Sequence, residues 1–160
     1  VNEAIENVLT ITSQQLMNLN IRVVRQLEAD LPRVMGDSNQ LEQVLLNLIS
    51  NARDAMDKAR EKTLTLETIS HPIQGNVEIK ITDTGTGIPR EIIDKIFDPF
   101  FTTKKVGKGT GLGLSICYSI IQLHGGKIEV ESEVGRRSTF RILLPIPDKG
   151  DPDVKKDSGG

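Results

Sequence analysis

Three side chains with amide or carboxylate oxygens recur along one predicted helix. Asn47, Asn51 and Asp54 are four and three residues apart within the predicted helix 39–58, so they lie on one stripe of its surface. Asparagine is a poor residue for a helix interior because its amide competes for nearby backbone groups. One interpretation of this stripe is a solvated flank of the helix. The other is a row of oxygen ligands for Mg²⁺, which accepts amide, carboxylate, water and phosphate oxygens.

A second candidate site directly follows a predicted strand. The segment Asp83–Ile88, with the sequence DTGTGI, begins where the strand 77–82 ends. Gly85 and Gly87 would let the backbone approach a flat ligand closely, and the Asp83 carboxylate is a hydrogen-bond acceptor. A simple turn would show the same D-x-G-x-G pattern, so this segment alone does not decide between a turn and a binding loop.

A third candidate is rich in glycine and precedes a helix. The segment Gly107–Gly113 has the sequence GKGTGLG. Its glycines would expose backbone N–H groups, and the N-terminus of the predicted helix 114–124 adds a favourable dipole, so the segment could cradle phosphate. It matches neither the G-x-G-x-x-G fingerprint nor a Walker A loop. A flexible linker is the alternative, but linkers rarely run into so apolar a helix.

The composition is that of one globular domain. Of the 160 residues, 37% are hydrophobic and 26% are charged, which excludes a disordered or membrane class. Twenty basic and 22 acidic residues give a net charge of −2, so no strongly basic field is available for nucleic acid. The single cysteine, Cys117, excludes a disulfide framework and is expected in the core. The chain starts at Val1 without a signal peptide, and we interpret it as an excised cytoplasmic domain.

The elements that must position these candidates are interleaved helices and strands. Periodicity predicts helices at 2–19, 39–58, 89–96 and 114–124. Alternation predicts strands at 21–27, 63–70, 77–82, 127–133 and 139–144. Several strand connections are too short for a parallel crossover. We therefore predict an α/β two-layer sandwich over residues 1–147, with a mixed, mostly antiparallel sheet covered by helices on one face. A disordered tail is predicted at 148–160.

Four segments, taken together and in order, resemble the N, G1, F and G2 boxes of bacterial sensor histidine kinases. They are Asn47–Ala52 (NLISNA), Asp83–Gly87 (DTGTG), Phe97–Phe101 (FDPFF) and Gly107–Gly113. The resemblance covers roughly residues 1–145. It implies the catalytic ATP-binding domain of such a kinase, with the Bergerat fold that gyrase B and the mismatch-repair ATPases share. The implied activity is binding of Mg-ATP and donation of its γ-phosphoryl group to a histidine in two-component signalling.

The resemblance also implies roles for matching residues. Asp83 would accept a hydrogen bond from the adenine amino group, with Gly85 and Gly87 in the same loop and Ile88 packing nearby. Asn51 would coordinate Mg²⁺, and Asn47 would lie beside the γ-phosphate.

The remaining implied contacts lie mainly in a mobile ATP lid. Its phosphate-wrapping residues would be Gly109, Thr110, Gly111, Leu112, Gly113 and Leu114, and its cations Lys104, Lys105 and Lys108. The phenylalanine cluster would anchor the other end of the lid. The family often carries a basic residue for the phosphates after the second asparagine. Arg53 is present here, but Asp54 follows it, which is a first departure from the family pattern. The second departure concerns Thr139 near the adenine, because Arg137 replaces a usual glycine.

The phosphoacceptor is expected on another part of the parent protein. Neither His71 nor His124 has the His-Glu/Asp context of the family's dimerisation helix. At a helix end, a protonated His124 would simply favour the dipole. The predicted partners are therefore an upstream dimerisation and phosphoacceptor domain and the receiver domain of a response regulator, with no nucleic acid and no direct membrane contact. We expect the isolated domain to be a monomer.

Two alternatives stay open on the sequence. A GHKL-type ATPase would share the fold, but it carries a glutamate base one helical turn before the metal-binding asparagine. Here that position is Asn47, whose amide cannot take a proton from water. A non-catalytic nucleotide-binding or interaction module would share the glycine-rich loops, and the intact asparagines argue mildly against it.

Overall fold

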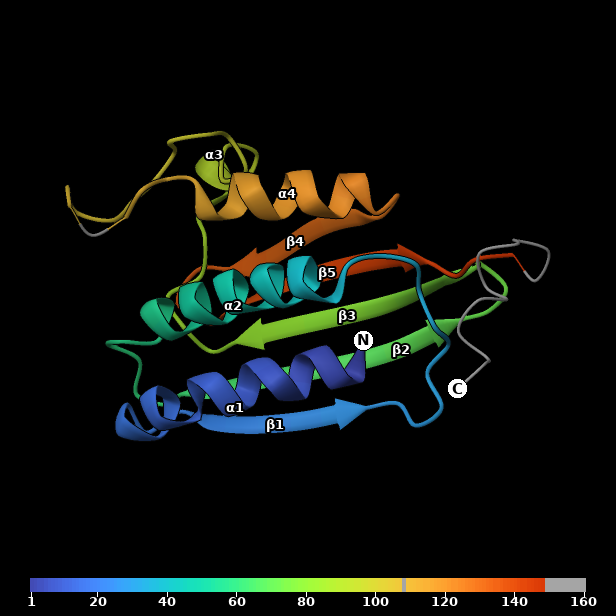
Figure 1. Ribbon diagram of the computed structural model, residues 1–160. Helices are drawn as coiled ribbons and strands as arrows, with labels where there is room; N and C mark the ends of the chain where they lie inside the picture. Colours follow the sequence, from blue (N-terminus) through green and yellow to red (C-terminus); the bar gives the residue numbers. More distant parts are fainter. Residues whose placement is uncertain (108, 149–160) are drawn as a thin grey trace.

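The computed structural model describes residues 1–107 and 109–148, so the predictions for Lys108 and for the tail at 149–160 lie outside the described residues. In the described part of the chain, nine elements follow one another (Figure 1). They are α1 (Asn2–Asn18), β1 (Arg22–Leu27), α2 (Ser38–Ala55), β2 (Thr63–His71), β3 (Asn76–Asp83), α3 (Arg90–Ile93), α4 (Gly113–Leu123), β4 (Lys127–Glu133) and β5 (Arg137–Pro145). Within these residues no helix is long and apolar enough to cross a membrane.

The five strands form one mixed sheet in the order β1-β2-β3-β5-β4. The strands β1 and β2 are parallel, and the other three pairs are antiparallel. The helices α1, α2 and α4 lie side by side over one face of this sheet (Figure 1). The predicted two-layer α/β sandwich is therefore confirmed, with its mostly antiparallel sheet and its helices on a single face.

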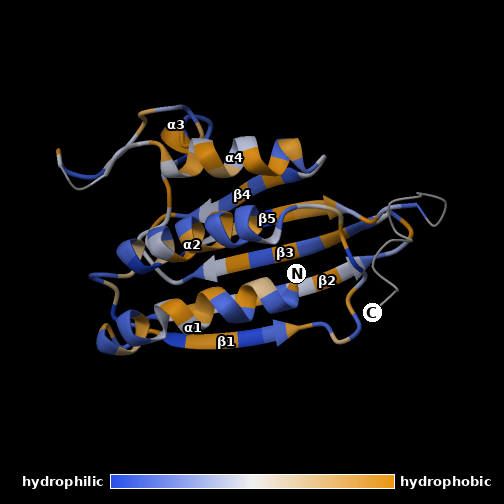
Figure 2. Ribbon diagram, in the orientation of Figure 1, coloured by the Kyte–Doolittle hydropathy of each residue, from blue (hydrophilic) through white to orange (hydrophobic). Residues whose placement is uncertain are grey.

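Alternation along the central strands sorts their side chains between the two faces. On β3, Ile79, Ile81 and Asp83 are buried and face the helices, whereas Lys80 and Thr82 line the open face. The hydropathy colouring of the strands shows the same alternation (Figure 2). Because side chains alternate between the two faces of a strand, Asp83 lies on the same buried face as Ile79 and Ile81, next to the helices.

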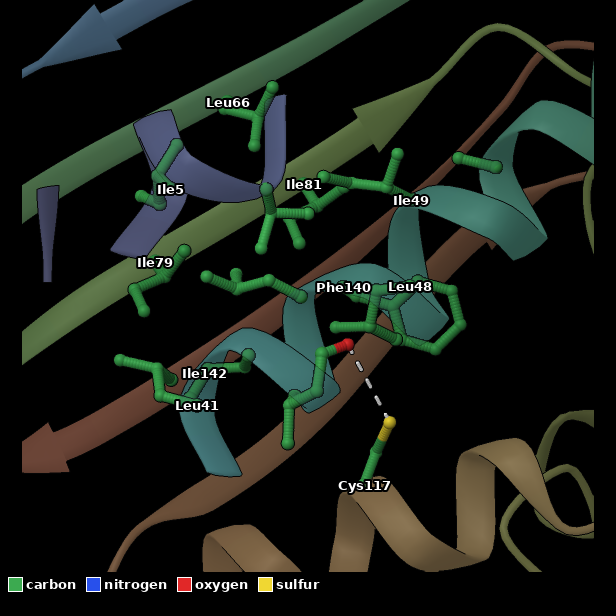
Figure 3. Close-up of a cluster of buried hydrophobic side chains, with 14 of the residues drawn as sticks. Ile5, Leu41, Leu48, Ile49, Leu66, Ile79, Ile81, Cys117, Phe140 and Ile142 are labelled. Carbon is green, nitrogen blue, oxygen red and sulfur yellow. Dashed lines mark hydrogen bonds between the residues drawn. The ribbon is translucent and has the colours of Figure 1, made fainter. Parts of the chain in front are cut away.

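The core is almost entirely aliphatic, because only 3% of the residues in the chain are aromatic. Figure 3 shows side chains from α1, α2 and the strands β2, β3 and β5 meeting in one cluster. The fully buried members include Ile5, Leu48, Ile49, Leu66, Ile79, Ile81 and Ile142. This packing fixes α2 between its neighbours, so the asparagines on its flank have a defined position relative to the sheet.

The helix α2 begins at a strong cap and ends earlier than its periodicity predicts. The Asp37 carboxylate accepts from the backbone N–H groups of Asn39 at 2.8 Å and Gln40 at 3.3 Å. The helix stops at Ala55, and a turn follows instead of helix to residue 58. The predicted helix at 89–96 is only the single turn of α3. Both differences lie at helix ends, where local sequence determines structure least.

Candidate nucleotide-binding site

The Asp83 carboxylate is buried at the end of β3, with its residue only 3% exposed. Its Oδ1 accepts a hydrogen bond from the Gly85 N–H at 2.9 Å. Burial raises the pKa of Asp83 to about 6, against the opposing effect of the Gly85 bond. The Gly85 bond uses one acceptor site of Oδ1, so the carboxylate keeps acceptor capacity for a ligand, including both lone pairs of Oδ2.

The loop after Asp83 is docked against the end of α2. The Thr86 N–H donates to the Ala55 carbonyl at 3.1 Å. A Cβ at Gly85 would lie 2.5 Å from the same carbonyl oxygen, so only glycine fits there. The loop and the asparagine-bearing helix are therefore in direct backbone contact.

The other side of this loop is held by the turn between β4 and β5. The Gly135 N–H donates to the Thr86 carbonyl at 2.7 Å, and the Ile88 N–H donates to Ser132 Oγ at 2.7 Å. Gly87 has a φ of +73°, and a Cβ there would overlap the Glu133 carbonyl. Contacts on both sides hold the loop in one conformation.

The asparagine stripe meets the beginning of α4. Asn47 Nδ2 approaches the Gly113 carbonyl at 3.5 Å, and Cys117 Sγ approaches the Val44 carbonyl at 3.8 Å (Figure 3). Asn51 lies one turn further along α2 and is half-buried. The first N–H groups of α4 lack helical partners and carry a partial positive charge. This is an environment suited to phosphate.

The segment between α3 and α4 is fastened at its glycine-rich end. The Phe100 N–H donates to the Gly111 carbonyl at 2.8 Å, and both residues have positive φ. Phe97 packs against Tyr118 and Phe140, with ring centroids 5.8 and 6.4 Å apart. The phenylalanine cluster, Phe97, Phe100 and Phe101, therefore has a structural role, because its contacts attach this segment to the core and to the beginning of α4.

The described residues in the middle of this segment are exposed, and an ion pair links them to α2. Lys104 Nζ lies 2.7 Å from Asp54 Oδ2, and Lys105 is exposed. Arg53 bonds to Asp54 and to Gln15 of α1, which directs its guanidinium toward α1. Partial burial raises the pKa of Asp54, but the bonds from Lys104 and Arg53 outweigh it and leave this pKa below its ordinary value.

The structure brings most of the predicted residues together but places Thr139 elsewhere. Thr139 lies on the open face of the sheet, where its hydroxyl is 3.0 Å from that of Thr82. It lines a hollow of about 730 Å³ on that face. Its neighbour Ser138 pairs with Asp83 in the β3–β5 register, is 3% exposed and faces the helices. Counting back by two from the buried Phe140 would have selected Ser138.

The sequence comparison identifies the family. Residues 36–148 match the family described as "Histidine kinase-, DNA gyrase B-, and HSP90-like ATPase". Sensor kinase CckA of Brucella abortus is 49% identical over 127 residues, which cover 72% of this chain and 13% of that protein. Sporulation kinase C of Bacillus subtilis is 39% identical over 147 residues, which cover 91% of this chain and 33% of that protein. The chain therefore spans a third or less of the length of these relatives.

Solved structures agree with this assignment. The catalytic domain of histidine kinase ThkA superposes with a TM-score of 0.79 at 34% identity, covering 91% of this chain and 93% of that one. ThkA in complex with the response regulator TrrA gives 0.76 at 30% identity, with coverages of 92% and 40%. Full-length ShkA in complex with AMPPNP gives 0.80 at 25% identity, with coverages of 94% and 31%.

The chain belongs to this ATPase family. Within it, the kinase relatives and the catalytic-domain structures define the chain as the catalytic ATP-binding domain of a two-component sensor histidine kinase.

Proposed function

We propose that the domain holds Mg-ATP between the 83–88 loop, α2 and the 100–113 segment, and donates the γ-phosphoryl group to a histidine on a separate helical domain. Asp83 Oδ2 accepts from the exocyclic amino group of adenine, and the phosphates extend toward Asn47 and the beginning of α4. The observation that carries this proposal is the backbone contact between Thr86 and Ala55. This contact fixes the position of Asp83 relative to the asparagines of α2. Phosphoryl transfer requires such fixed positions, because its catalysis depends mainly on positioning the reactants.

Asn51 is proposed as the metal ligand. Among residues 1–107 and 109–148, no group of three or more His, Cys, Asp or Glu side chains could hold a metal ion. A cation here would rely on an amide oxygen, phosphate oxygens and water, which suits Mg²⁺. The bound ion would neutralise charge on the phosphates. The Asn51→Ala variant should therefore lose ATP affinity in Mg²⁺ and little in chelator, whereas equal losses would indicate a folding defect.

Both histidines of the domain are engaged away from the proposed site. His71 Nε2 lies 2.7 Å from the buried Glu78 carboxylate, at the end of β2 remote from Asp83 and roughly 20 Å along the strand. His124 bonds to Asp37 and Ile120 at the far end of α4. This supports transfer to a histidine outside the described residues, with the bond from phosphorus to ADP breaking as a bond from phosphorus to imidazole nitrogen forms.

Hydrolysis is the competing reaction, and the site gives it little help. A water-activating base would be expected at position 47, where the side chain is an amide. General-base catalysis typically contributes about 10²–10⁴-fold, so its loss makes hydrolysis slow. This favours kinase function over a GHKL-type ATPase. By analogy with the ThkA–TrrA complex, we propose a response regulator as the second partner of the parent kinase.

A labelled-ATP transfer assay tests this function. The domain alone should bind γ-labelled ATP, retain no stable label and release little ADP. Addition of a cognate helical phosphoacceptor domain should give acid-labile label on that domain, because the acceptor then reaches the γ-phosphate at close range. Stoichiometric self-labelling of the 160-residue chain that is lost in His71→Ala or His124→Ala would contradict the proposal. Rapid hydrolysis without the acceptor would favour the ATPase.

A further inference from the structure

The turn between β4 and β5 holds the nucleotide loop through a side chain as well as through backbone. Ser132 is the last residue but one of β4, and its Oγ lies 2.7 Å from the Ile88 nitrogen. The same Oγ lies 3.0 Å from the Arg137 carbonyl and 2.8 Å from Ser138 Oγ. One hydroxyl therefore contacts the loop, the turn and the residue that pairs with Asp83.

The chemistry of these neighbours fixes the direction of the bonds. The Ile88 N–H can only donate, and the Arg137 carbonyl can only accept. A hydroxyl has one proton to donate and two lone pairs that accept. Ser132 consequently donates to Arg137 and accepts from Ile88, and its second lone pair accepts from Ser138. All three bonding capacities of the Ser132 hydroxyl are then used.

We propose that Ser132 is a positioning residue for ATP binding, which holds the 83–88 loop through the Ile88 N–H and so sets affinity at the base end of the nucleotide. The inference rests on the proposed function, because it assumes that this loop receives adenine. Removing the hydroxyl leaves the Ile88 N–H without its acceptor and frees the Ser138 proton next to Asp83. Ser132 bonds to Ile88, Arg137 and Ser138, none of which belongs to α2 or α4, so we expect the phosphate end to be unaffected.

A second hydroxyl pair in the same sheet provides a matched control. Thr82 and Thr139 form a cross-strand hydroxyl pair at 3.0 Å between β3 and β5, on the open face. Thr82→Val removes a bond of similar length from the same sheet but not from the loop. If Ser132 acted only by stabilising the sheet, Ser132→Ala and Thr82→Val would have similar effects on binding.

Calorimetry with ADP and ATP separates these roles. Ser132→Ala should weaken both nucleotides about three- to tenfold, the size expected for one lost hydrogen bond, and leave the ratio of ATP to ADP affinity unchanged. Ser132→Thr, which keeps the hydroxyl, should restore affinity to within about twofold. In the transfer assay, Ser132→Ala should raise KM for ATP at unchanged kcat. Wild-type affinity in Ser132→Ala, or equal losses in Thr82→Val, would overturn the proposal.

Amide exchange in the nucleotide-free protein tests the positioning independently of the proposed function. The Ile88 amide should exchange at least fivefold faster in Ser132→Ala than in wild type, and the Gly85 amide, which bonds to Asp83, should not change. If the wild type bound no nucleotide, the proposed function would fail while this exchange result still reported on Ser132. An unchanged Ile88 rate would refute the positioning role even if ATP binds.

Discussion

The two halves of the proposed ATP site are held in different ways. The 83–88 loop is bonded on both sides, to Ala55 of α2 and to the turn at 132–135. The 102–107 segment is exposed along its length and reaches α2 through the Lys104–Asp54 ion pair. We propose that the base-binding half is formed before the nucleotide arrives. For the phosphate-binding half, we propose a lid that becomes ordered on binding, since an exposed ion pair contributes only about 0–1 kcal/mol.

The largest effect is expected from adding one methyl group to the base-binding half. Gly85→Ala places a Cβ 2.5 Å from the Ala55 carbonyl oxygen, so the loop must leave α2. We expect a loss of about 3 kcal/mol in the free energy of unfolding and loss of measurable ADP binding. Gly107→Ala is the matched change in the other half. Its Cβ would meet nothing within 4 Å, and only its φ of +88° opposes alanine, so the cost should stay near 1 kcal/mol. Equal costs in urea titrations would contradict the comparison.

Asp83→Asn should separate binding from stability. The amide oxygen can still accept from Gly85, but its NH₂ group would then face the adenine amino group, so ADP affinity should fall by about 1–3 kcal/mol. The empty protein should become more stable by about 2 kcal/mol, because a carboxylate with a raised pKa no longer has to be buried as an anion. Asp57→Asn, at an exposed carboxylate just beyond α2, should change neither quantity. A destabilised Asp83→Asn protein would count against this account.

The pH dependence of Asp83 has opposite signs for stability and for binding. Its folded pKa of about 6 lies above the ordinary 3.8, so the folded state binds the proton more tightly. Protonation between pH 7 and 4 therefore adds to the free energy of unfolding, while ADP affinity falls as pH drops through 6. Glu28, Glu78 and Asp54 have lowered pKa values and act in the opposite direction on stability. The difference between wild type and Asp83→Asn isolates the Asp83 contribution, and parallel pH profiles for the two proteins would refute it.

The smallest predicted effect concerns the ion pair of the lid. Asp54→Asn should free Lys104 to meet phosphate and raise ATP affinity about two- to threefold, more for ATP than for ADP. Lys104→Ala should lower it by a similar factor. Both effects should decrease in high salt, because exposed charges are screened. Fluorescence competition at two ionic strengths would measure them, and a salt-independent change would indicate another cause.

Sequence patterns predicted the fold and the loops better than they predicted individual contacts. Periodicity located α1, α2, α4 and the five strands because their buried faces repeat clearly. Thr139, predicted near the adenine, lies on the open face of the sheet, whereas strand alternation places Ser138 beside Asp83 on the helix-covered face. The sequence predicts that His124 is a protonated side chain that interacts with the dipole at the end of a helix. In the structure its Nε2 accepts from the Asp37 N–H at 3.0 Å, so its ring also links the end of α4 to the start of α2.

These differences share a physical cause. The acceptor of the His124 bond lies 87 residues from its donor, and Ser132 lies 44 residues from Ile88. No local pattern reports such contacts. Gly36 is a further example of a requirement that local sequence does not report. A side chain at this position would overlap His124, and this overlap becomes visible only when α4 packs against the start of α2.

Amide hydrogen exchange, measured with and without Mg-ATP, tests the difference between the two halves most directly. In the empty protein, the amides of Gly85, Thr86 and Ile88 should already be protected, since each has a defined acceptor. The amides of residues 105–107 should exchange fast and become protected only when Mg-ATP is added. Equally slow exchange of both segments before ATP, or no protection of 105–107 after it, would contradict a preformed base site with a lid that orders on binding.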